Sequence, residues 1–499
     1  MHICLVNLPR YEVNRPPLSL AVLSAICDSH QVDYSCVDLS LLIWQKLQDD
    51  FYDIDNFCIT KIINDPVKQR LQELIDKVII NTISKYPNTT FALSLLSFWS
   101  QPVAELFCQR VKQLSNCEVL VGGQGLDNPT WTDRLKQQKL IDNFIVGEGE
   151  ISFKKFLEGC RSGPGINNYD FEQIDDLDLH CFIPNYSKLP LDQYPYLNNT
   201  PSLFITASRG CVRNCSYCDI GHQWKKYRYR DAKNVAKEMI TQYERHNIQE
   251  FFFTDSLING SMKMLNELCD VLIDYKQKNP GANFKWRGQY IFRPKHTVNE
   301  EHIKKLADSG VDYLIVGLET GSDKVRYSMN KKHTTDDAEW FLEMFKKYKI
   351  QCRLLMITGY VTEELDDHRR TLELFSRWQK FVASETITGI ELGSILMILD
   401  NSPVGQQKHE LEMSFVNDKP YAWHSGKNPE LDMFERVRRR IETHREAIKY
   451  NWPITRSLYR LNTIKHNLLE VVDYYKIHGN TTKKVIPIML KKTGSEEPV

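Results

Sequence analysis

The chain has 499 residues, of which 42% are hydrophobic and 26% charged, with 64 basic and 64 acidic side chains. The length predicts two or three domains, and the composition excludes a disordered or fibrous chain. The formal net charge of zero argues against a protein that holds nucleic acid by bulk electrostatics, because such proteins usually carry a basic excess.

No stretch approaches the roughly 20 uninterrupted apolar residues of a membrane span. The first ten residues also lack the positive region and the cleavage site of a secretory signal. We therefore expect a cytoplasmic protein without a membrane span, whose thiols are mostly reduced. Ten of the thirteen cysteines are scattered along the chain, and we expect these ten to pack as small hydrophobic side chains.

Residues 1–158 alternate short apolar runs with helical patterns. Strands separated by helices predict a parallel sheet with helices on both faces, that is, an α/β fold with a Rossmann-like doubly wound domain. The predicted strands are His2–Leu8, Val32–Val37, Thr90–Leu96, Val119–Val121 and Asn143–Val146.

Residues 159–200 hold Gly163-Pro-Gly165, an acidic run and four prolines, which is typical of a linker. A second alternation of strands and helices covers 201–404 and predicts a partial (β/α)6 barrel. Residues 405–499 are predicted to be mostly helical and to help cover the mouth of the barrel. The predicted barrel strands are Leu203–Thr206, Glu250–Thr254, Phe284–Tyr290, Tyr313–Gly317, Cys352–Ile357 and Gly389–Met397.

Three cysteines stand apart from the others, in the loop after the first predicted barrel strand. Cys211, Cys215 and Cys218 have the spacing C-x3-C-x2-C and can wrap one metal centre. With His222 they could form a structural zinc site, and the basic and aromatic stretch 224–230 would then indicate nucleic-acid binding. Alternatively, three thiolates hold a [4Fe–4S] cluster and leave its fourth iron open. The second interpretation is favoured, because zinc fingers separate two ligand pairs by a longer loop and barrel active sites lie at this rim.

The C-x3-C-x2-C spacing, with an aromatic residue before the third cysteine, resembles the radical S-adenosylmethionine (SAM) superfamily. The resemblance implies that Cys211, Cys215 and Cys218 ligate the cluster and that SAM chelates its open iron. One-electron reduction, from a donor such as a flavodoxin or ferredoxin, then releases a 5′-deoxyadenosyl radical that takes hydrogen from a substrate. Tyr217 is expected beside the adenine, mainly through backbone contacts. A small-molecule substrate is expected, and nucleic acid is not.

Other strand ends carry further candidate residues. Asp255 could cap the next helix, or could lie near the methionyl group of SAM, as the resemblance favours. Arg287 could line the pocket or pair with a carboxylate at the rim. Glu319, in Gly317-Leu-Glu319, resembles the residue that meets SAM at the fourth strand, and burial predicts a ligand or ion-pair partner for it. Met356–Tyr360 is expected to shape the adenine wall, although Tyr360-Val-Thr-Glu363 departs from the family pattern.

A doubly wound domain before such a barrel resembles the cobalamin-binding domain of many of these enzymes. Ser94, Gly122 and Gly123 match its pattern, because glycines at a strand end allow a flat ligand to approach the backbone. Gly122-Gly123 could also be only a tight turn. The loop Pro9–Pro17 lacks the Asp-x-His-x-x-Gly motif whose histidine ligates cobalt, and His30 resembles it only by accident. Cobalamin would thus bind without a histidine ligand, or the domain could be a scaffold without the cofactor.

The sequence therefore predicts a radical SAM enzyme, in which the cofactors carry the difficult chemistry. Cobalamin-assisted methylation of an unactivated carbon is the first expectation, followed by radical rearrangement or cyclisation. A zinc-stabilised nucleic-acid-binding protein is the rival from another class. Nothing in the sequence names the substrate.

Overall fold

A computed structural model describes residues 1–9, 13–126, 128–171, 173–180, 182–393 and 395–455. The chain divides into two compact units. Unit 1 comprises Met1–Thr206 and Arg228–Phe252, and unit 2 comprises Ala207–Tyr227 and Phe253–Val499. None of the described helices is both long enough and apolar enough to cross a membrane.

Unit 1 contains a five-stranded parallel sheet in the order β2-β1-β3-β4-β5. This order confirms the predicted doubly wound sheet and puts the reversal of strand order between β1 and β3. By register, Asn7, Ser94 and Gly122 lie side by side at the carboxyl edge. The strands are β1 His2–Asn7, β2 Asp33–Asp38, β3 Thr89–Ser94, β4 Glu118–Gly122 and β5 Asn143–Ile145.

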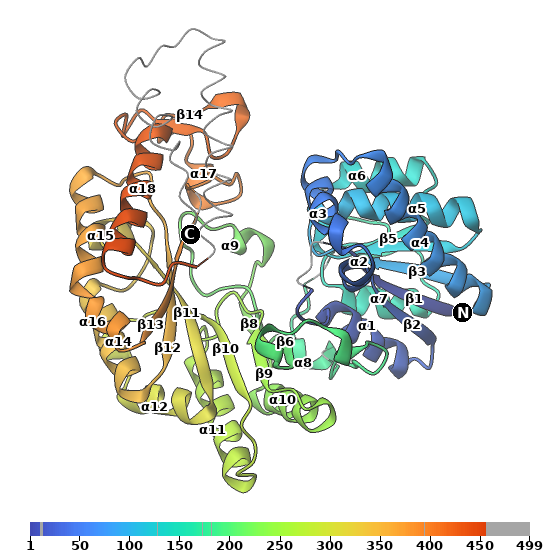
Figure 1. Cartoon of the computed structure of the whole chain (residues 1–499), viewed down its shortest axis with the longest axis horizontal. Helices are drawn as coiled ribbons and strands as arrows, with labels where there is room; N and C mark the ends of the chain where they lie inside the picture. The colour runs from blue at the N-terminus through green and yellow to red at the C-terminus, as the bar shows by residue number, and fades with distance from the viewer. Residues whose placement is uncertain (10–12, 127, 172, 181, 394, 456–499) are drawn as a thin grey trace. The chain divides into compact units, whose positions relative to one another are not determined.

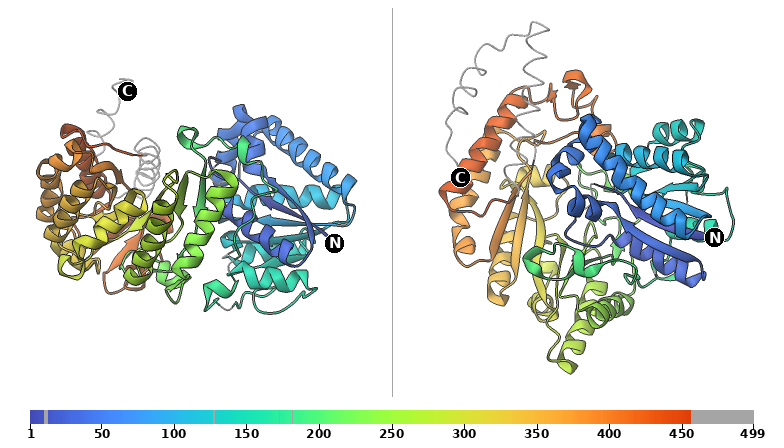
Figure 2. Two further views of the ribbon diagram at one scale, coloured as in Figure 1. Left: turned by 90° about the horizontal axis from the view of Figure 1, so that it is seen from below. Right: turned by 45° about the vertical axis from the view of Figure 1, so that its right-hand side comes forward.

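Helices cover both faces of this sheet (Figures 1 and 2). On one face α1 packs against α7, and on the other α5 packs against α3 and α4. Local signals begin these helices: Asn64 caps α4 ahead of a proline, and Asp38 caps α2 through its side chain. The helices are α1 Leu18–Ser29, α2 Leu39–Lys46, α3 Phe51–Thr60, α4 Asp65–Lys85, α5 Gln101–Leu114, α6 Pro129–Gln137 and α7 Gly149–Leu157.

The described residues of the segment 159–200 belong to unit 1 and form short helical turns and isolated β-bridges, and its role as a linker stays a prediction. Two of its residues contact the sheet of unit 1: Tyr194 donates a hydrogen bond to Asp38 at 2.9 Å, and Phe171 packs where a side chain at Gly147 would lie. The turns are α8 Leu177–His180, η4 Leu191–Gln193 and η5 Leu197–Asn199.

A second sheet has six strands in the order β13-β12-β11-β10-β9-β6, which confirms the predicted partial barrel. Within this sheet, β10 to β13 pair in parallel. The strands are β6 Ser202–Ile205, β9 Glu250–Phe253, β10 Lys285–Tyr290, β11 Val311–Glu319, β12 Gln351–Met356 and β13 Ile387–Leu392.

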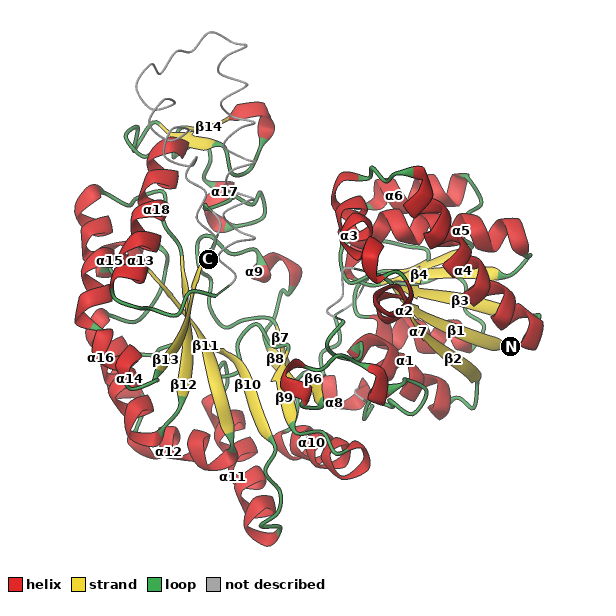
Figure 3. Cartoon of the chain, in the orientation of Figure 1, coloured by secondary structure: helices red, strands yellow, loops and turns green. Residues whose placement is uncertain are grey.

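Helices alternate with these strands along the chain, as the sequence predicts. Asn299 caps α12, which ends at Gly310 with φ +100°, and α14 begins with a capping box formed by Thr334 and Asp337. In unit 2, α12, α14 and α15 run along the outside of the strands (Figure 3). The helices are α10 Ala232–His246, α11 Met262–Lys278, α12 Glu300–Ser309, α13 Asp323–Ser328, α14 Thr335–Tyr348, α15 Leu365–Arg377 and α16 Gln379–Ala383.

Residues 403–455 form α17 Pro403–Gln406, the antiparallel pair β14 Met413–Phe415 and β15 Trp423–Ser425, and α18 Met433–Lys449. The small strand pair was not predicted, since its strands are only three residues long. Ile454 then bridges to Ile390 of β13 in parallel. The remainder of the predicted helical region, 456–499, lies outside the described residues.

Three arginines of α18 are buried, although the run 435–440 is strongly charged. Arg436 donates to the carbonyl oxygens of Tyr421 and Trp423 at 3.1 and 2.6 Å, and its guanidinium lies 3.8 Å from the Trp423 ring centre. Arg439 pairs with Glu363 at 3.0 Å, and Arg440 donates to Leu392 at 2.7 Å. The inner side of α18 thus holds the loops that follow β12 and β13.

Candidate functional site

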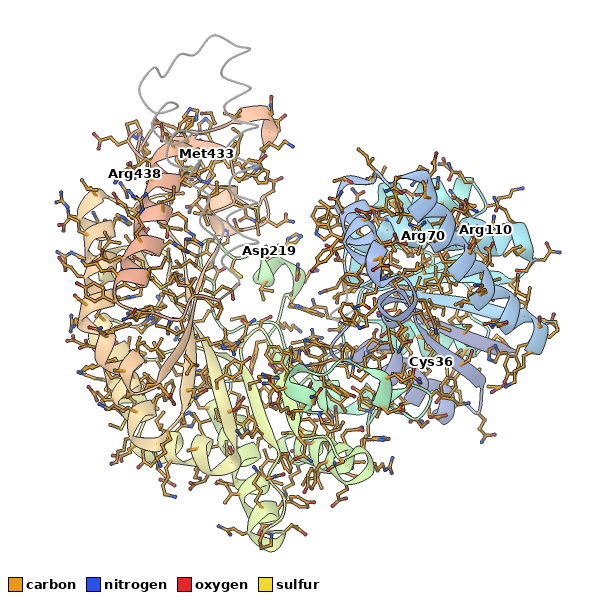
Figure 4. All side chains as sticks on the ribbon, viewed as in Figure 1. Cys36, Arg70, Arg110, Asp219, Met433 and Arg438 are labelled. Atoms are coloured by element: carbon orange, nitrogen blue, oxygen red, sulfur yellow. The ribbon has the colours of Figure 1, made fainter. Side chains whose placement is uncertain are left out.

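The three motif cysteines lie in a loop that follows β7 (Ser208–Arg209), in unit 2. All three thiols are free and partly exposed. The loop begins at Gly210, whose φ is +85° and where a Cβ would lie 2.7 Å from the Lys226 carbonyl oxygen, so glycine is required. It ends at α9, Ile220–Gln223, beside which Asp219 is labelled in Figure 4.

Burial raises the pKa of each of the three thiols, that of Cys218 to about 11. The Lys331 ammonium opposes this rise for Cys211 and Cys215. Within the part of the chain that the structure describes, no three His, Cys, Asp or Glu side chains converge on a single ion. A single zinc ion would need all three thiolates within about 2.3 Å of it. In a [4Fe–4S] cluster, each thiolate binds a different iron, so the thiolates can lie farther apart.

Tyr217, Glu319 and Lys331 form one hydrogen-bonded group beside the cysteine loop. Tyr217 donates its hydroxyl to Glu319 Oε1 at 2.8 Å, and Lys331 Nζ donates to the same oxygen at 2.7 Å. Glu319 is 5% exposed and Lys331 9% exposed, so this is a buried ion pair. The prediction of an ion-pair partner for Glu319 thus agrees with the structure, while the Tyr217 side chain takes part in a contact that was not predicted.

Lys331 is the residue of this group that sequence reasoning did not single out. Burial lowers its pKa, but Glu319 and the Cys215 thiolate raise it, and its pKa lies above the ordinary value. Its segment contacts the cysteine loop directly: Asn330 donates to the Asn214 carbonyl at 2.8 Å, and Ser216 N donates to Met329 O at 3.2 Å. The signal that could have found it is a lysine twelve residues beyond a buried glutamate at a strand end.

Glu319 has a φ of +68°, which non-glycine residues rarely adopt. Its main-chain oxygen accepts from Ile357 N at 2.7 Å, which holds the end of β11 against the end of β12. Backbone strain of this kind persists where the surrounding structure over-determines a residue, and it concentrates at functional sites.

Asp255 is buried and accepts hydrogen bonds from Ala207 N at 3.0 Å and from Ser208 Oγ at 2.5 Å. It does not cap the next helix, because the cap of α11 is Ser261. The carboxylate instead braces the two residues that enter the cysteine loop. Its position among SAM contacts stays a prediction.

Because burial raises the pKa of Asp255 to about 6, above its ordinary value of 3.8, this group stabilises the fold at low pH. That contribution is lost as the pH rises through 6, and we expect the free energy of unfolding to fall by about 2 kcal/mol between pH 4 and pH 7. In Asp255→Asn, the free energy of unfolding, measured with urea, should change less between pH 4 and pH 7 than in the wild type. Asp270→Asn, at a half-exposed position on α11, is the control, and equal slopes for wild type and Asp255→Asn would contradict the assignment.

Two further predicted wall residues have defined contacts. Arg287 donates to the Tyr313 hydroxyl at 3.2 Å, and both roles weighed for it from sequence stay predictions. Tyr360 lies 2.5 Å from Ser216 Oγ, hydroxyl to hydroxyl, so the segment after β12 does contact the cysteine loop.

The basic stretch 224–230 is less basic on the surface than its sequence implies. Within unit 1, Arg228 pairs with Glu148 at 2.6 Å and Arg230 pairs with Glu238 at 2.6 Å, all of them buried. His222 is exposed on α9. Two of the cations that suggested nucleic-acid binding are therefore neutralised inside the fold.

The residues matched to a cobalamin domain lie at the carboxyl edge of the unit 1 sheet. Ser94 Oγ donates to Ser19 Oγ at 3.0 Å. At Gly123, with φ +110°, a Cβ would lie 2.3 Å from Leu95 O, so glycine is needed there for the turn itself. At Gly122 a Cβ would meet only Ile145, at 3.5 Å, so packing does not explain that glycine. Part of the loop Pro9–Pro17, residues 10–12, lies outside the described residues.

His30 ends α1 and binds the Ile26 carbonyl at 2.9 Å, just before β2 begins. It is thus at the amino edge of the sheet, opposite Ser94. This placement agrees with the prediction that its likeness to a cobalt-ligating motif is accidental.

Residues 205–375 match the profile of the Radical SAM superfamily. This segment of the chain, about a third of its length, is thus similar to the radical SAM superfamily. The matched segment includes the three cysteines together with Asp255, Glu319 and Lys331. Enzymes of the radical SAM superfamily use a [4Fe–4S] cluster and SAM, which favours the cluster over the zinc interpretation of the cysteine loop.

Among curated proteins, the chain is 24% identical over 290 residues to an uncharacterised methyltransferase of Pyrococcus horikoshii, covering 54% of this chain and 60% of that protein. It is 23% identical over 273 residues to the anaerobic magnesium-protoporphyrin IX monomethyl ester cyclase of Synechocystis, covering 51% and 52%. The chain thus spans between half and three fifths of the length of these two relatives.

Two solved radical SAM structures share the fold over most of the chain. The methyltransferase TsrM from Kitasatospora setae, solved with cobalamin and a [4Fe–4S] cluster, has a TM-score of 0.61 at 17% identity, covering 82% of this chain and 78% of that chain. The cobalamin-dependent enzyme OxsB, solved with aqua-cobalamin and SAM, has a TM-score of 0.61 at 16% identity, covering 84% and 62%. Both likenesses extend well beyond the superfamily segment.

Proposed function

We propose that this chain is a cobalamin-dependent radical SAM enzyme that transfers a methyl group to an unactivated carbon of a small-molecule substrate. The observation that carries this proposal is the loop of three free cysteines beside the buried Tyr217–Glu319–Lys331 group. A one-electron donor, such as a flavodoxin or ferredoxin, belongs to the proposal.

The donor set fits a [4Fe–4S] cluster with one open iron. Cys211, Cys215 and Cys218 offer three soft ligands within eight residues, and no disulfide removes any of them. Lys331 places a buried positive charge where it attracts the thiolates of Cys211 and Cys215. This charge offsets part of the negative charge that three thiolates bring into a partly buried loop.

Residues around the loop suit the binding of SAM. When bound at a reduced cluster, SAM supplies a 5′-deoxyadenosyl radical. Glu319 would then face the amino group or the nucleoside, held in place by Lys331 and Tyr217. Asp255 would orient the entry to the loop through Ala207 and Ser208. Preorganisation of this kind lets a site position its ligand without rearranging.

The carboxyl edge of unit 1 suits a flat ligand. Its strand order reverses between β1 and β3, which is where doubly wound sheets bind ligands. Ser94 offers a hydroxyl at this point, and Gly122 leaves the backbone uncovered at the same level. Ser94, Gly122 and the turn at Gly123 would thus hold cobalamin without a histidine ligand.

The decisive experiment measures cofactor content and products of the full-length protein, purified and reconstituted without oxygen. We expect about four iron and four sulfide per chain and, after reduction, 5′-deoxyadenosine from SAM. S-adenosylhomocysteine formed together with 5′-deoxyadenosine would support methyl transfer, whereas 5′-deoxyadenosine alone would support rearrangement or cyclisation. One zinc per chain without sulfide would refute the proposal.

Replacing Gly122 by valine tests the cobalamin site. A side chain there meets only Ile145 at ordinary contact distance, so the sheet should fold, while the branched carbons cover the backbone. We expect the affinity for cobalamin, measured by absorbance titration, to fall by about 10-fold or more. Gly281→Val, in a loop of unit 2 where an added Cβ meets nothing within 4 Å, is the control. Unchanged cobalamin affinity in Gly122→Val would place the cofactor away from Gly122, and no cobalamin binding to the wild type would reduce unit 1 to a scaffold.

A further inference from the structure

Within unit 2, strands β10 to β13 of the barrel sheet have a helix-covered outer face and an inner face. Trp286 of β10 belongs to the outer face, because its indole donates to Ser309 of α12 at 3.2 Å. Successive side chains of a strand alternate between faces. Arg287 and Gln289 therefore project from the inner face of β10.

The inner face is partly exposed to solvent. Parallel sheets usually bury both faces, yet Gln289 is exposed, and Ile315 of β11 and Leu355 of β12 are only half-buried. Their neighbours on the outer face, Leu314 and Leu354, are fully buried. Gln289 is a polar side chain exposed on the inner face of a strand that is not at the edge of the sheet. Its amide can hydrogen-bond to a polar ligand there.

Two guanidinium groups meet one tyrosine on this face. The guanidinium carbon of Arg353, from β12, lies 4.0 Å from the centre of the Tyr313 ring, and that of Arg287, from β10, lies 5.2 Å from it. The aromatic face orients both cations. Opposite Arg353 in the register is Gly389, where a Cβ would lie 3.0 Å from Arg353 Cγ, so the glycine makes room for the arginine stem.

Arg353 has no acidic partner in the described part of the chain. Its Nε is buried and finds no acceptor there, and the Tyr313 ring is its contact. The acid on the neighbouring strand, Glu391, stands opposite Leu355 rather than Arg353. Other buried arginines have acceptors: Arg439 pairs with Glu363, and Arg436 and Arg440 donate to main-chain carbonyls. A half-buried cation without an anion is costly, and a bound anion would offset that cost.

The geometry points to an anion subsite on this inner face, in which Arg353, with Arg287 beside it, binds a carboxylate or phosphate group of the substrate. A guanidinium matches both groups, because its donors form a planar fork. That the bound anion belongs to the substrate rests on the proposed function. The subsite then narrows the substrate to anionic small molecules.

The test titrates inorganic pyrophosphate and succinate separately into the reconstituted full-length protein at saturating SAM, by calorimetry. With the SAM site saturated, the added anions cannot bind in place of the carboxylate of SAM. We expect at least one of the two anions to bind wild type one to one, Arg353→Met to weaken that binding by about 10-fold or more, and Arg353→Lys to weaken it less. Arg377→Met, at an arginine paired with Glu339 outside the barrel, should change the affinity less than about 2-fold.

Several results would overturn the subsite. Binding of neither anion to wild type would do so, as would equal binding by Arg353→Met. A loss of SAM affinity in Arg353→Met without a change in anion affinity would assign the guanidinium to the cofactor instead. If Arg353→Met unfolds at a lower temperature, Arg353→Lys decides. Anion binding that persists in a protein forming no 5′-deoxyadenosine would support the subsite while refuting the proposed function.

Discussion

Replacing Cys215 by alanine is expected to abolish the formation of 5′-deoxyadenosine under reducing conditions. Two remaining thiolates cannot hold three of the four irons, so iron and sulfide content should fall with activity. We expect 5′-deoxyadenosine formation to fall by more than about 100-fold. That is the upper end of the effect seen when a residue that only hydrogen-bonds to a metal ligand is removed. Product is measured by mass spectrometry after reduction of the reconstituted protein, and iron by colorimetric assay.

Cys160 supplies a matched control for this experiment, because its thiol is exposed and free, and it lies in unit 1. Cys160→Ala should keep the iron content and the product yield of the wild type. If Cys215→Ala retains turnover, the ligand assignment is wrong, whatever its iron content.

The second large effect is expected from Arg436→Met in α18. Arg436 is fully buried, and burial lowers its pKa to about 9. Its removal leaves the carbonyls of Leu396, Tyr421 and Trp423 without this donor and also removes the stack on the Trp423 ring. We expect the free energy of unfolding to fall by about 3 kcal/mol or more, measured by urea unfolding.

Arg438, two residues along the same helix, provides the comparison (Figure 4). Its side chain is 41% exposed and pairs with Glu435 and Glu442 at the surface. Arg438→Met should therefore cost no more than about 1 kcal/mol. Similar losses for Arg436→Met and Arg438→Met would mean that α18 is stabilised by its charge in general and not by the buried contacts.

Periodicity predicted the strands and helices of both sheets, since parallel strands read as short apolar runs between amphipathic helices. The three cysteines could be found because their spacing is local. Glu319 could be found because a carboxylate that ends a buried strand needs a partner. Each of these signals lies within a dozen residues of sequence.

The features that escaped prediction depend on contacts between distant segments. Arg436 and Arg440 look like a solvated charged run, and only the carbonyls of Trp423 and Leu392 explain why they are buried. Lys331 gains its position from its bond to Glu319 and from the bond of its neighbour Asn330 to Asn214. Arg353 stands out only once the register sets it beside Tyr313.

The hold of α18 on the strand-end loops limits where this chain could be shortened. A protein that ended after residue 404 would keep every barrel strand but lose the donors to Leu392, Gly393 and Leu396, and also the bridge from Ile454 to β13. We therefore expect the barrel to be less stable without this region. A chimaera that exchanges the carboxyl-terminal region with that of a relative would have to carry the arginines and the loops they bind as one block.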